Sequence, residues 1–110
     1  MKRVLLVSSF LLLTFILPLD LSSQAKDVYE SQCASCHASN GSGATAAGKK
    51  LGVIDLRSKE VRSMSDEELF ESIAYGVKHK EYPHAFGRRG MSTDQINDLV
   101  AFIRKLPAHK

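Results

Sequence analysis

The sequence has few of the residues that would place it in several common classes of protein. It contains only 2 cysteines and 4 histidines. A structural zinc site usually draws on two separate pairs of Cys or His, and this chain offers no second pair at a matching spacing. The strand–helix–strand pattern that surrounds a thioredoxin-like dithiol is also missing. These absences weigh against a zinc module and against a dithiol oxidoreductase.

An excess of charge of one sign is absent too. The chain carries 15 Lys and Arg against 12 Asp and Glu. Without residues 1–25, it retains 13 basic and 11 acidic residues. A balance this close does not support nucleic-acid binding, although the sequence pI of about 9.0 is basic.

Long hydrophobic runs are missing as well. The longest, residues 4–17, follows Lys2 and Arg3 and is shorter than the roughly 18 residues expected of a membrane-spanning helix. Pro18 and the small-residue stretch Ser23-Gln24-Ala25 come after it. A basic start, a short apolar run and a small-residue end are typical of a secretory signal peptide.

We therefore expect residues 1–25 to be a signal peptide that is cleaved after Ala25, leaving a domain over residues 26–110. The protein would then be periplasmic or otherwise exported. Retention of the apolar run as a membrane anchor is the alternative. A domain of this size has little core of its own and usually needs a covalent or metal staple.

The most informative motif is Cys33-Ala34-Ser35-Cys36-His37, which reads C-x-x-C-H. This is the attachment motif for c-type haem. Cys33 and Cys36 are expected to form the thioethers to the haem, and His37 is expected to bind the iron. One covalently bound haem would also supply the staple that so small a domain needs, so we expect the chain without haem to fold poorly.

Three helices are predicted from periodicity and capping residues. The first covers residues 27–35. The second follows a capping box at Ser65 and Glu68, and the third follows a similar pair at Ser92 and Gln95. Residues 38–52 hold four of the 7 glycines with no clear period, so they are expected to form a loop along one edge of the haem.

Together, the C-x-x-C-H motif after a short first helix and a closing helix that ends in residues 101–106 resemble the class I c-type cytochromes. The resemblance implies an all-α, small cytochrome c fold that is wrapped around one haem c. It also implies that the first and last helices cross beside the haem. Phe102 would lie at this crossing, with Tyr29 opposite it.

The second axial ligand is where this sequence departs from the family. Members commonly carry Met-Pro in the loop before the last helix, whereas this loop has Tyr82 before Pro83. Counted back from the cap at Ser92, the family's methionine position falls on His84. Imidazole is a good ligand for haem iron, so we favour His84 as the sixth ligand.

Met91 is the alternative sixth ligand. It directly precedes Ser92, with Ile96 at the fourth helical position, which is the arrangement of a hydrophobic staple. Met64 stands in the same relation to a helix start, so we expect both methionines to be packing residues. Tyr82 is a further ligand candidate, and His79 is expected to be a solvated loop residue.

These features predict an exported one-electron carrier that is not an enzyme. His/His ligation would give its haem a low reduction potential. The alternative is a haem-based sensor, or a module that binds gas or peroxide at an open sixth site. Redox proteins are the expected partners, and basic residues around the haem edge would attract acidic docking surfaces on them. The alternative is that these basic residues form a solvated face without a docking role. Those residues are Lys49, Lys50, Lys78, Lys80, Arg88 and Arg89.

Overall fold

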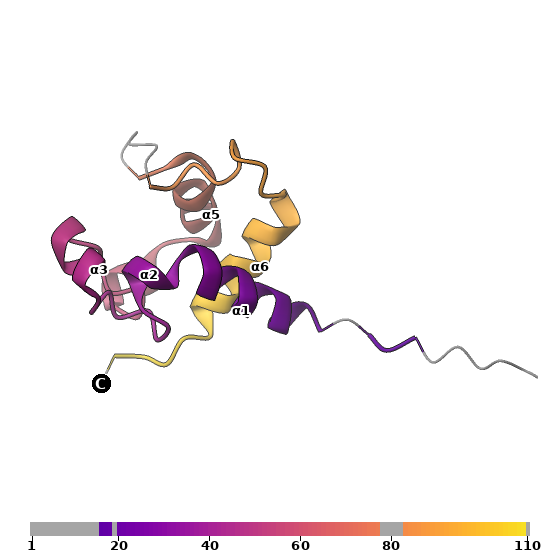
Figure 1. Ribbon diagram of the computed structural model, residues 1–110, viewed down its shortest axis with the longest axis horizontal. Helices are drawn as coiled ribbons and strands as arrows, with labels where there is room; N and C mark the ends of the chain where they lie inside the picture. The colour runs from indigo at the N-terminus through magenta and orange to yellow at the C-terminus, as the bar shows by residue number, and fades with distance from the viewer. Residues whose placement is uncertain (1–15, 19, 78–82, 110) are drawn as a thin grey trace, which may run out of the picture.

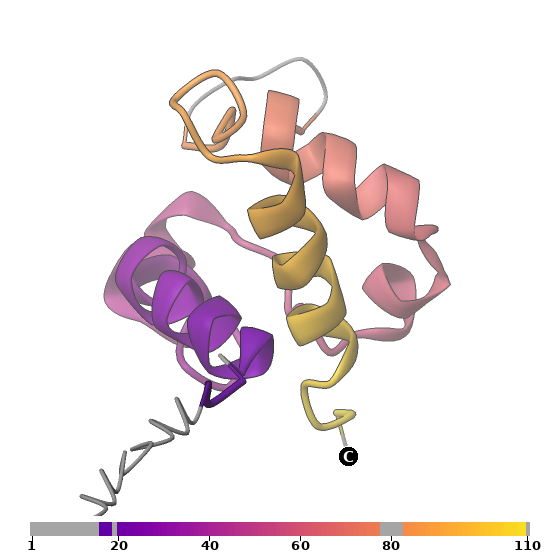
Figure 2. The same cartoon turned by 90° about the vertical axis from the view of Figure 1, so that its right-hand side faces the viewer.

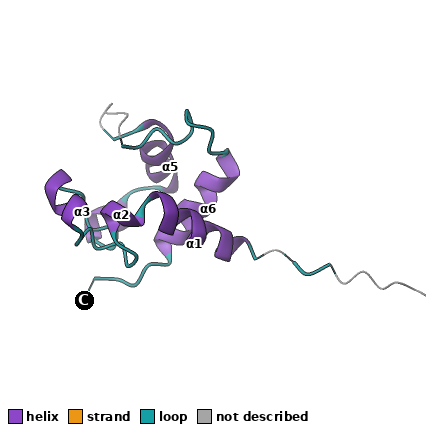
Figure 3. Cartoon of the chain, in the orientation of Figure 1, coloured by secondary structure: helices purple, strands orange, loops and turns teal. Residues whose placement is uncertain are grey.

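The computed structural model describes residues 16–18, 20–77 and 83–109. Figure 3 shows that the described chain consists of helices and loops. It therefore has the predicted all-α fold. The helices are α1 (Leu21–Gln32), α2 (Ala34–His37), α3 (Ala46–Leu51), α4 (Lys59–Ser63), α5 (Asp66–Tyr75) and α6 (Thr93–Arg104).

The first and last helices pack directly on each other, as Figures 1 and 2 show for α1 and α6. At their contact, the rings of Tyr29 and Phe102 lie 4.8 Å apart between centroids and are tilted by 40°. Tyr29 is completely buried, and its hydroxyl donates a hydrogen bond of 2.7 Å to the Ala38 carbonyl. The predicted aromatic pair at the helix crossing is confirmed.

The second and third predicted helices correspond to α5 and α6. Both capping boxes are present, with Ser65 and Glu68 at the start of α5 and Ser92 and Gln95 at the start of α6. Each box satisfies backbone N–H groups that would otherwise lack partners at the helix start. The first residues of α5 and α6 are therefore fixed by local sequence, independently of the rest of the fold.

The main hydrophobic cluster lies where α4, α5 and α6 meet. Its buried members are Val61, Leu69, Val100, Ile103 and Leu106. Met64 packs against this cluster, so its predicted role as a packing residue is confirmed. The cluster gives α5 a fixed place against α6, and the end of α5 in turn supports the loop that carries His84.

The helix α4 was not predicted from the sequence. It is held to the end of α6 by two arginines. The Arg104 side chain donates to the Met64 carbonyl at 2.5 Å and to Asp66 Oδ1 at 2.9 Å. Arg62 donates to the Leu106 carbonyl at 2.6 Å. Contacts between residues this far apart in the chain leave no local signal in the sequence.

The first helix differs from its predicted bounds of 27–35. It begins at Leu21, because the Asp20 side chain accepts a hydrogen bond of 3.0 Å from the Ser22 N–H and so caps an earlier turn. It ends at Gln32, and Cys33 separates it from α2. The helix thus runs through Ala25, which is 5% exposed, while the position of leader cleavage stays a prediction.

The expectation that residues 38–52 form only a loop is wrong, since the second half of this segment contains α3. Thr45 caps it by accepting a hydrogen bond of 2.8 Å from the Gly48 N–H. Gly52 ends it in a left-handed conformation with φ of 64°. A helix this short shows too few residues for a hydrophobic period to be recognised.

Within the described ranges, no helix combines the length and the apolar character needed to cross a membrane.

The hydroxyl of Tyr29 provides a first test of the fold. Substitution Tyr29→Phe removes the bond to the Ala38 carbonyl and keeps the ring against Phe102. We expect the free energy of unfolding of the haem-loaded protein to fall by about 1 kcal/mol, measured by urea denaturation. Tyr75→Phe is the control, because Tyr75 is 52% exposed, and it should change the unfolding midpoint little. Equal effects of the two substitutions would contradict this assignment.

Gly48 provides a second test. A Cβ atom at this position would clash with the backbone carbonyls of Cys36 and Gly43, which cannot move aside as a flexible side chain can. Gly48→Ala should therefore destabilise the haem-loaded protein by about 1–3 kcal/mol, despite the better helix propensity of alanine. Lys49→Ala, at the exposed neighbouring position, should be nearly neutral. An unchanged unfolding midpoint in Gly48→Ala would show that the close approach of α3 is unimportant.

Candidate haem site

The C-x-x-C-H motif forms a single helical turn. The N–H groups of Cys36 and His37 both donate to the Cys33 carbonyl, at 3.2 Å and 2.9 Å. Residues three and four positions apart on a helix share one face. The turn therefore presents Cys33, Cys36 and His37 to the same side, which is what attachment of one haem to two thiols and one imidazole requires.

The segment after the motif clamps this turn from behind. Thr45 donates its hydroxyl hydrogen to the Cys36 carbonyl at 2.9 Å, and the Gly43 N–H donates to the His37 carbonyl at 2.8 Å. Gly48 lies directly against the same Cys36 carbonyl. The sequence analysis did not single out Thr45 or Gly48. The only local signal for the start of α3 was a Thr three residues before a Gly.

Both cysteines are free and only partly buried. Burial, and then the neighbouring Cys36, raise the pKa of the Cys33 thiol to about 11. A reactive dithiol needs a thiol whose pKa is lowered, because the thiolate is the nucleophile. The environment of Cys33 thus gives no support to the thioredoxin-like alternative.

The environment of His37 suits metal binding. Burial lowers its pKa, and the nearby His84 lowers it further. Its ring is therefore neutral at neutral pH, which is the form that binds metals. Among the described residues, its buried Nδ1 has no hydrogen-bond partner. A buried polar atom without a hydrogen bond lowers the stability of the folded state, and such atoms are often found at functional sites.

The structure brings His84 close to His37. Their ring centroids lie 6.1 Å apart, and the ring planes differ by 18°. A histidine nitrogen binds a transition metal at about 2 Å, so two imidazoles on opposite sides of one metal have centroids about 6 Å apart. The spacing thus fits two imidazoles that would hold one metal ion between them.

The end of α5 holds the loop that carries His84. The Phe86 N–H donates to the Ile73 carbonyl at 3.0 Å, and the Gly87 N–H donates to the Ala74 carbonyl at 3.2 Å. The next carbonyl toward the start of α5, that of Ser72, accepts a hydrogen bond from His84. Backbone hydrogen bonds of this kind fix the orientation of a ligating imidazole.

The pKa of His84 is also lowered overall. Burial is the largest cause, the hydrogen bond to Ser72 acts in the opposite direction, and the positive charge of Arg89 lowers the pKa again. His84 is thus neutral at neutral pH, like His37. Two neutral imidazoles next to each other avoid the repulsion that two imidazolium ions would experience.

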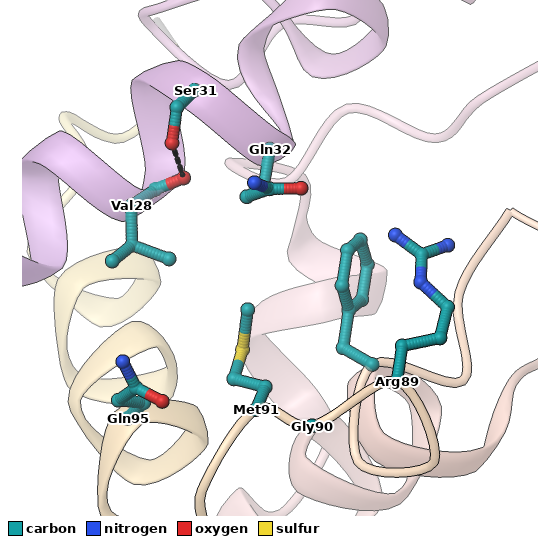
Figure 4. Close-up of a pocket in the computed structure, with 8 residues that line it drawn as sticks. Val28, Ser31, Gln32, Arg89, Gly90, Met91 and Gln95 are labelled. Atoms are coloured by element: carbon teal, nitrogen blue, oxygen red, sulfur yellow. Dashed lines mark hydrogen bonds between the residues drawn. The ribbon is translucent and has the colours of Figure 1, made fainter.

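Met91 has different surroundings. It lines a cavity of about 280 Å³ between α1 and the loop before α6, and none of Cys33, Cys36, His37 and His84 lines this cavity. Figure 4 shows the Met91 side chain extending toward Val28 and Gln32 of α1. Met91 thus borders open space away from these four residues, and whether Met91 or His84 binds iron stays a prediction, as does the packing role of Met91.

Several other candidates fall outside the described ranges, namely Tyr82, His79, Lys78 and Lys80. The remaining basic residues of the predicted docking surface, Lys49, Lys50, Arg88 and Arg89, are exposed. No three His, Cys, Asp or Glu side chains gather to hold a metal ion in the part of the chain that the structure describes.

Comparison with known proteins identifies the family of this chain. The family model for cytochrome c matches residues 22–107. A protein of Corynebacterium efficiens described as a cytochrome bc1 complex cytochrome c subunit is 31% identical over 88 residues, which cover 79% of this chain and 26% of the relative. This chain therefore spans about a quarter of that relative's length. Because the family match extends from α1 past the end of α6, we conclude that the protein belongs to the cytochrome c family, which implies covalently attached haem c.

Proposed function

We propose that this protein is an exported one-electron carrier whose haem iron is bound by His37 and His84. The observation that carries the proposal is the close approach of the two imidazoles, whose ring centroids lie 6.1 Å apart. The two rings reach this position from opposite parts of the chain, one from the turn after α1 and the other from the loop after α5.

The polypeptide's task in such a carrier is to hold the site still. Haem c, when bound, supplies an iron that alternates between the ferrous and ferric states. Cys33 and Cys36 anchor the group on one side, and the clamp formed by Thr45 and Gly48 fixes their turn. If His37 and His84 both held the iron, the change between ferrous and ferric states would need little movement of the chain.

Ligation by His84 also sets the expected potential. A methionine thioether raises the potential of haem iron relative to an imidazole. A carrier with His37 and His84 should therefore work at a lower potential than a family member with His/Met ligation. Low-potential respiratory electron transfer is the role that follows.

Export and partners complete the proposal. The basic start, the apolar run and the small-residue stretch within residues 1–25 support export through a leader. The exposed Lys49, Lys50, Arg88 and Arg89 support docking to an acidic surface on a redox partner. The Corynebacterium relative is described as part of a cytochrome bc1 complex, and a respiratory complex is the class of partner that we propose here.

The ligand assignment is tested by two substitutions in the haem-loaded protein. His84→Ala should convert the low-spin absorption spectrum to a high-spin one, because the sixth position loses its imidazole. Met91→Leu is the matched control, since it keeps the volume of a packing residue and removes the sulfur. It should leave the low-spin spectrum unchanged.

The reverse result would make Met91 the ligand. Near-infrared charge-transfer bands of the ferric protein give an independent readout, because they differ between His/His and His/Met ligation. A high-spin ferric spectrum in the unmodified protein would instead favour the sensor with an open sixth site.

Covalent attachment is tested by intact mass. The exported protein, denatured before measurement, should retain the mass of one haem. A variant with both Cys33→Ser and Cys36→Ser should lose that increment, because neither thioether can form. Ser35→Ala, between the two cysteines, is the control and should keep it. An unmodified polypeptide mass for the natural sequence would refute haem attachment.

A further inference from the structure

The loop that carries His84 contains a strained residue. Residues 83–89, here named the His84 loop, include Ala85, whose φ is 65°. This left-handed conformation is unfavourable for any residue with a Cβ atom. Ala85 is also buried, with 6% of its surface exposed. Backbone strain of this kind persists only where surrounding contacts enforce it, and it is concentrated at functional sites.

Part of the enforcement comes from α5. The two hydrogen bonds from Phe86 and Gly87 to the carbonyls of Ile73 and Ala74 hold the residues after Ala85. Within the loop, the Arg88 N–H donates to the Ala85 carbonyl at 3.1 Å. These bonds fix the second half of the loop, after His84.

Arg89 connects the two ends of the loop. Its Nη1 donates to the Pro83 carbonyl at 3.1 Å, directly before His84. Its guanidinium carbon lies 4.3 Å from the centroid of the Phe86 ring. The Phe86 ring in turn lies 6.2 Å from the His84 ring between centroids. One side chain therefore contacts the residue before His84 and the aromatic ring beside it.

We propose that Arg89 is the positioning residue that keeps the His84 loop closed against the strain at Ala85, and thereby controls how readily a small molecule displaces His84 from the iron. This inference rests on the proposed ligation by His84. It assigns to Arg89 a role beyond a surface charge for partner docking.

The geometry favours this role because the two Arg89 contacts break together. If His84 swings away, the Pro83 carbonyl moves with it, and the hydrogen bond and the contact with the Phe86 ring are both disturbed. A lysine has no planar group with several donors and cannot reproduce both contacts.

The test is the reaction of the reduced, haem-loaded protein with carbon monoxide. In this exchange a neutral CO molecule replaces the neutral imidazole of His84, so one bond to iron breaks, another forms, and no electron or proton moves. At low CO concentration, the observed rate is proportional to the fraction of molecules with an open loop. Arg89→Gln should raise this rate about tenfold, which corresponds to about 1.4 kcal/mol in favour of opening.

Two further variants separate the contacts of Arg89 with Pro83 and Phe86 from the effect of its positive charge. Lys105→Gln makes the same change in net charge at an exposed position after the end of α6, and it should leave the rate unchanged. Arg89→Lys keeps the charge, so it should retain the reduction potential of the natural protein but still react faster with CO. An unchanged rate in Arg89→Gln, or an equal rise in Lys105→Gln, would overturn the proposal.

The strain is tested by Ala85→Gly in the Arg89→Gln background. Glycine adopts the left-handed conformation without a steric penalty. The closed loop should become more stable, and the reaction with CO should slow toward the natural rate. No slowing would show that Ala85 does not oppose closure, and that part of the proposal would fall.

Failure of the proposed ligation is distinguished by His84→Ala. If that variant keeps the natural low-spin spectrum, His84 is not the ligand and control of its displacement falls with it. Loop closure then has its own readout in amide hydrogen exchange. Arg89→Gln should speed exchange at Phe86 and Gly87, whose N–H groups bond to α5, and unchanged exchange would show that Arg89 does not close the loop.

Discussion

The structure depends on the burial of Tyr29. Its ring lies against Phe102, which locks α1 to α6, and its hydroxyl binds the carbonyl of Ala38, directly after His37. A single side chain therefore joins the packing of the two terminal helices to the position of the turn that bears the cysteines. Because a buried hydroxyl must find a partner, the helix crossing and the placement of His37 are determined together.

The two histidines are held by contrasting means. His37 belongs to a helical turn that is clamped from behind by Thr45 and Gly48, whose contacts are to backbone carbonyl groups. His84 belongs to a loop without regular structure, held by hydrogen bonds to the end of α5 and by Arg89. The position of His37 is therefore fixed by backbone contacts, whereas the position of His84 depends on contacts that are exposed or strained.

Much of this arrangement was predictable from the sequence, for physical reasons that are local. The C-x-x-C-H spacing, the capping boxes at Ser65 and Ser92 and the pairing of Tyr29 with Phe102 follow from short-range rules or from the family resemblance. The short helices α3 and α4 were missed although Thr45 and Ser58 cap them, because helices of six and five residues are too short to show a hydrophobic period. Contacts of Gly48 and Arg104 with distant parts of the chain also hold them in place. The start of α1 was missed because Asp20 was assigned to the leader, where a capping role is not considered.

The early start of α1 has a consequence for the order of events in the life of this protein. Ser23, Gln24 and Ala25 lie within a hydrogen-bonded helix, and Ala25 is covered by its neighbours. A peptidase needs an extended, accessible strand of substrate, which a docked helix does not offer. If the leader is cleaved after Ala25, the cleavage must therefore come before α1 packs on α6. The leader would be removed before the domain has folded.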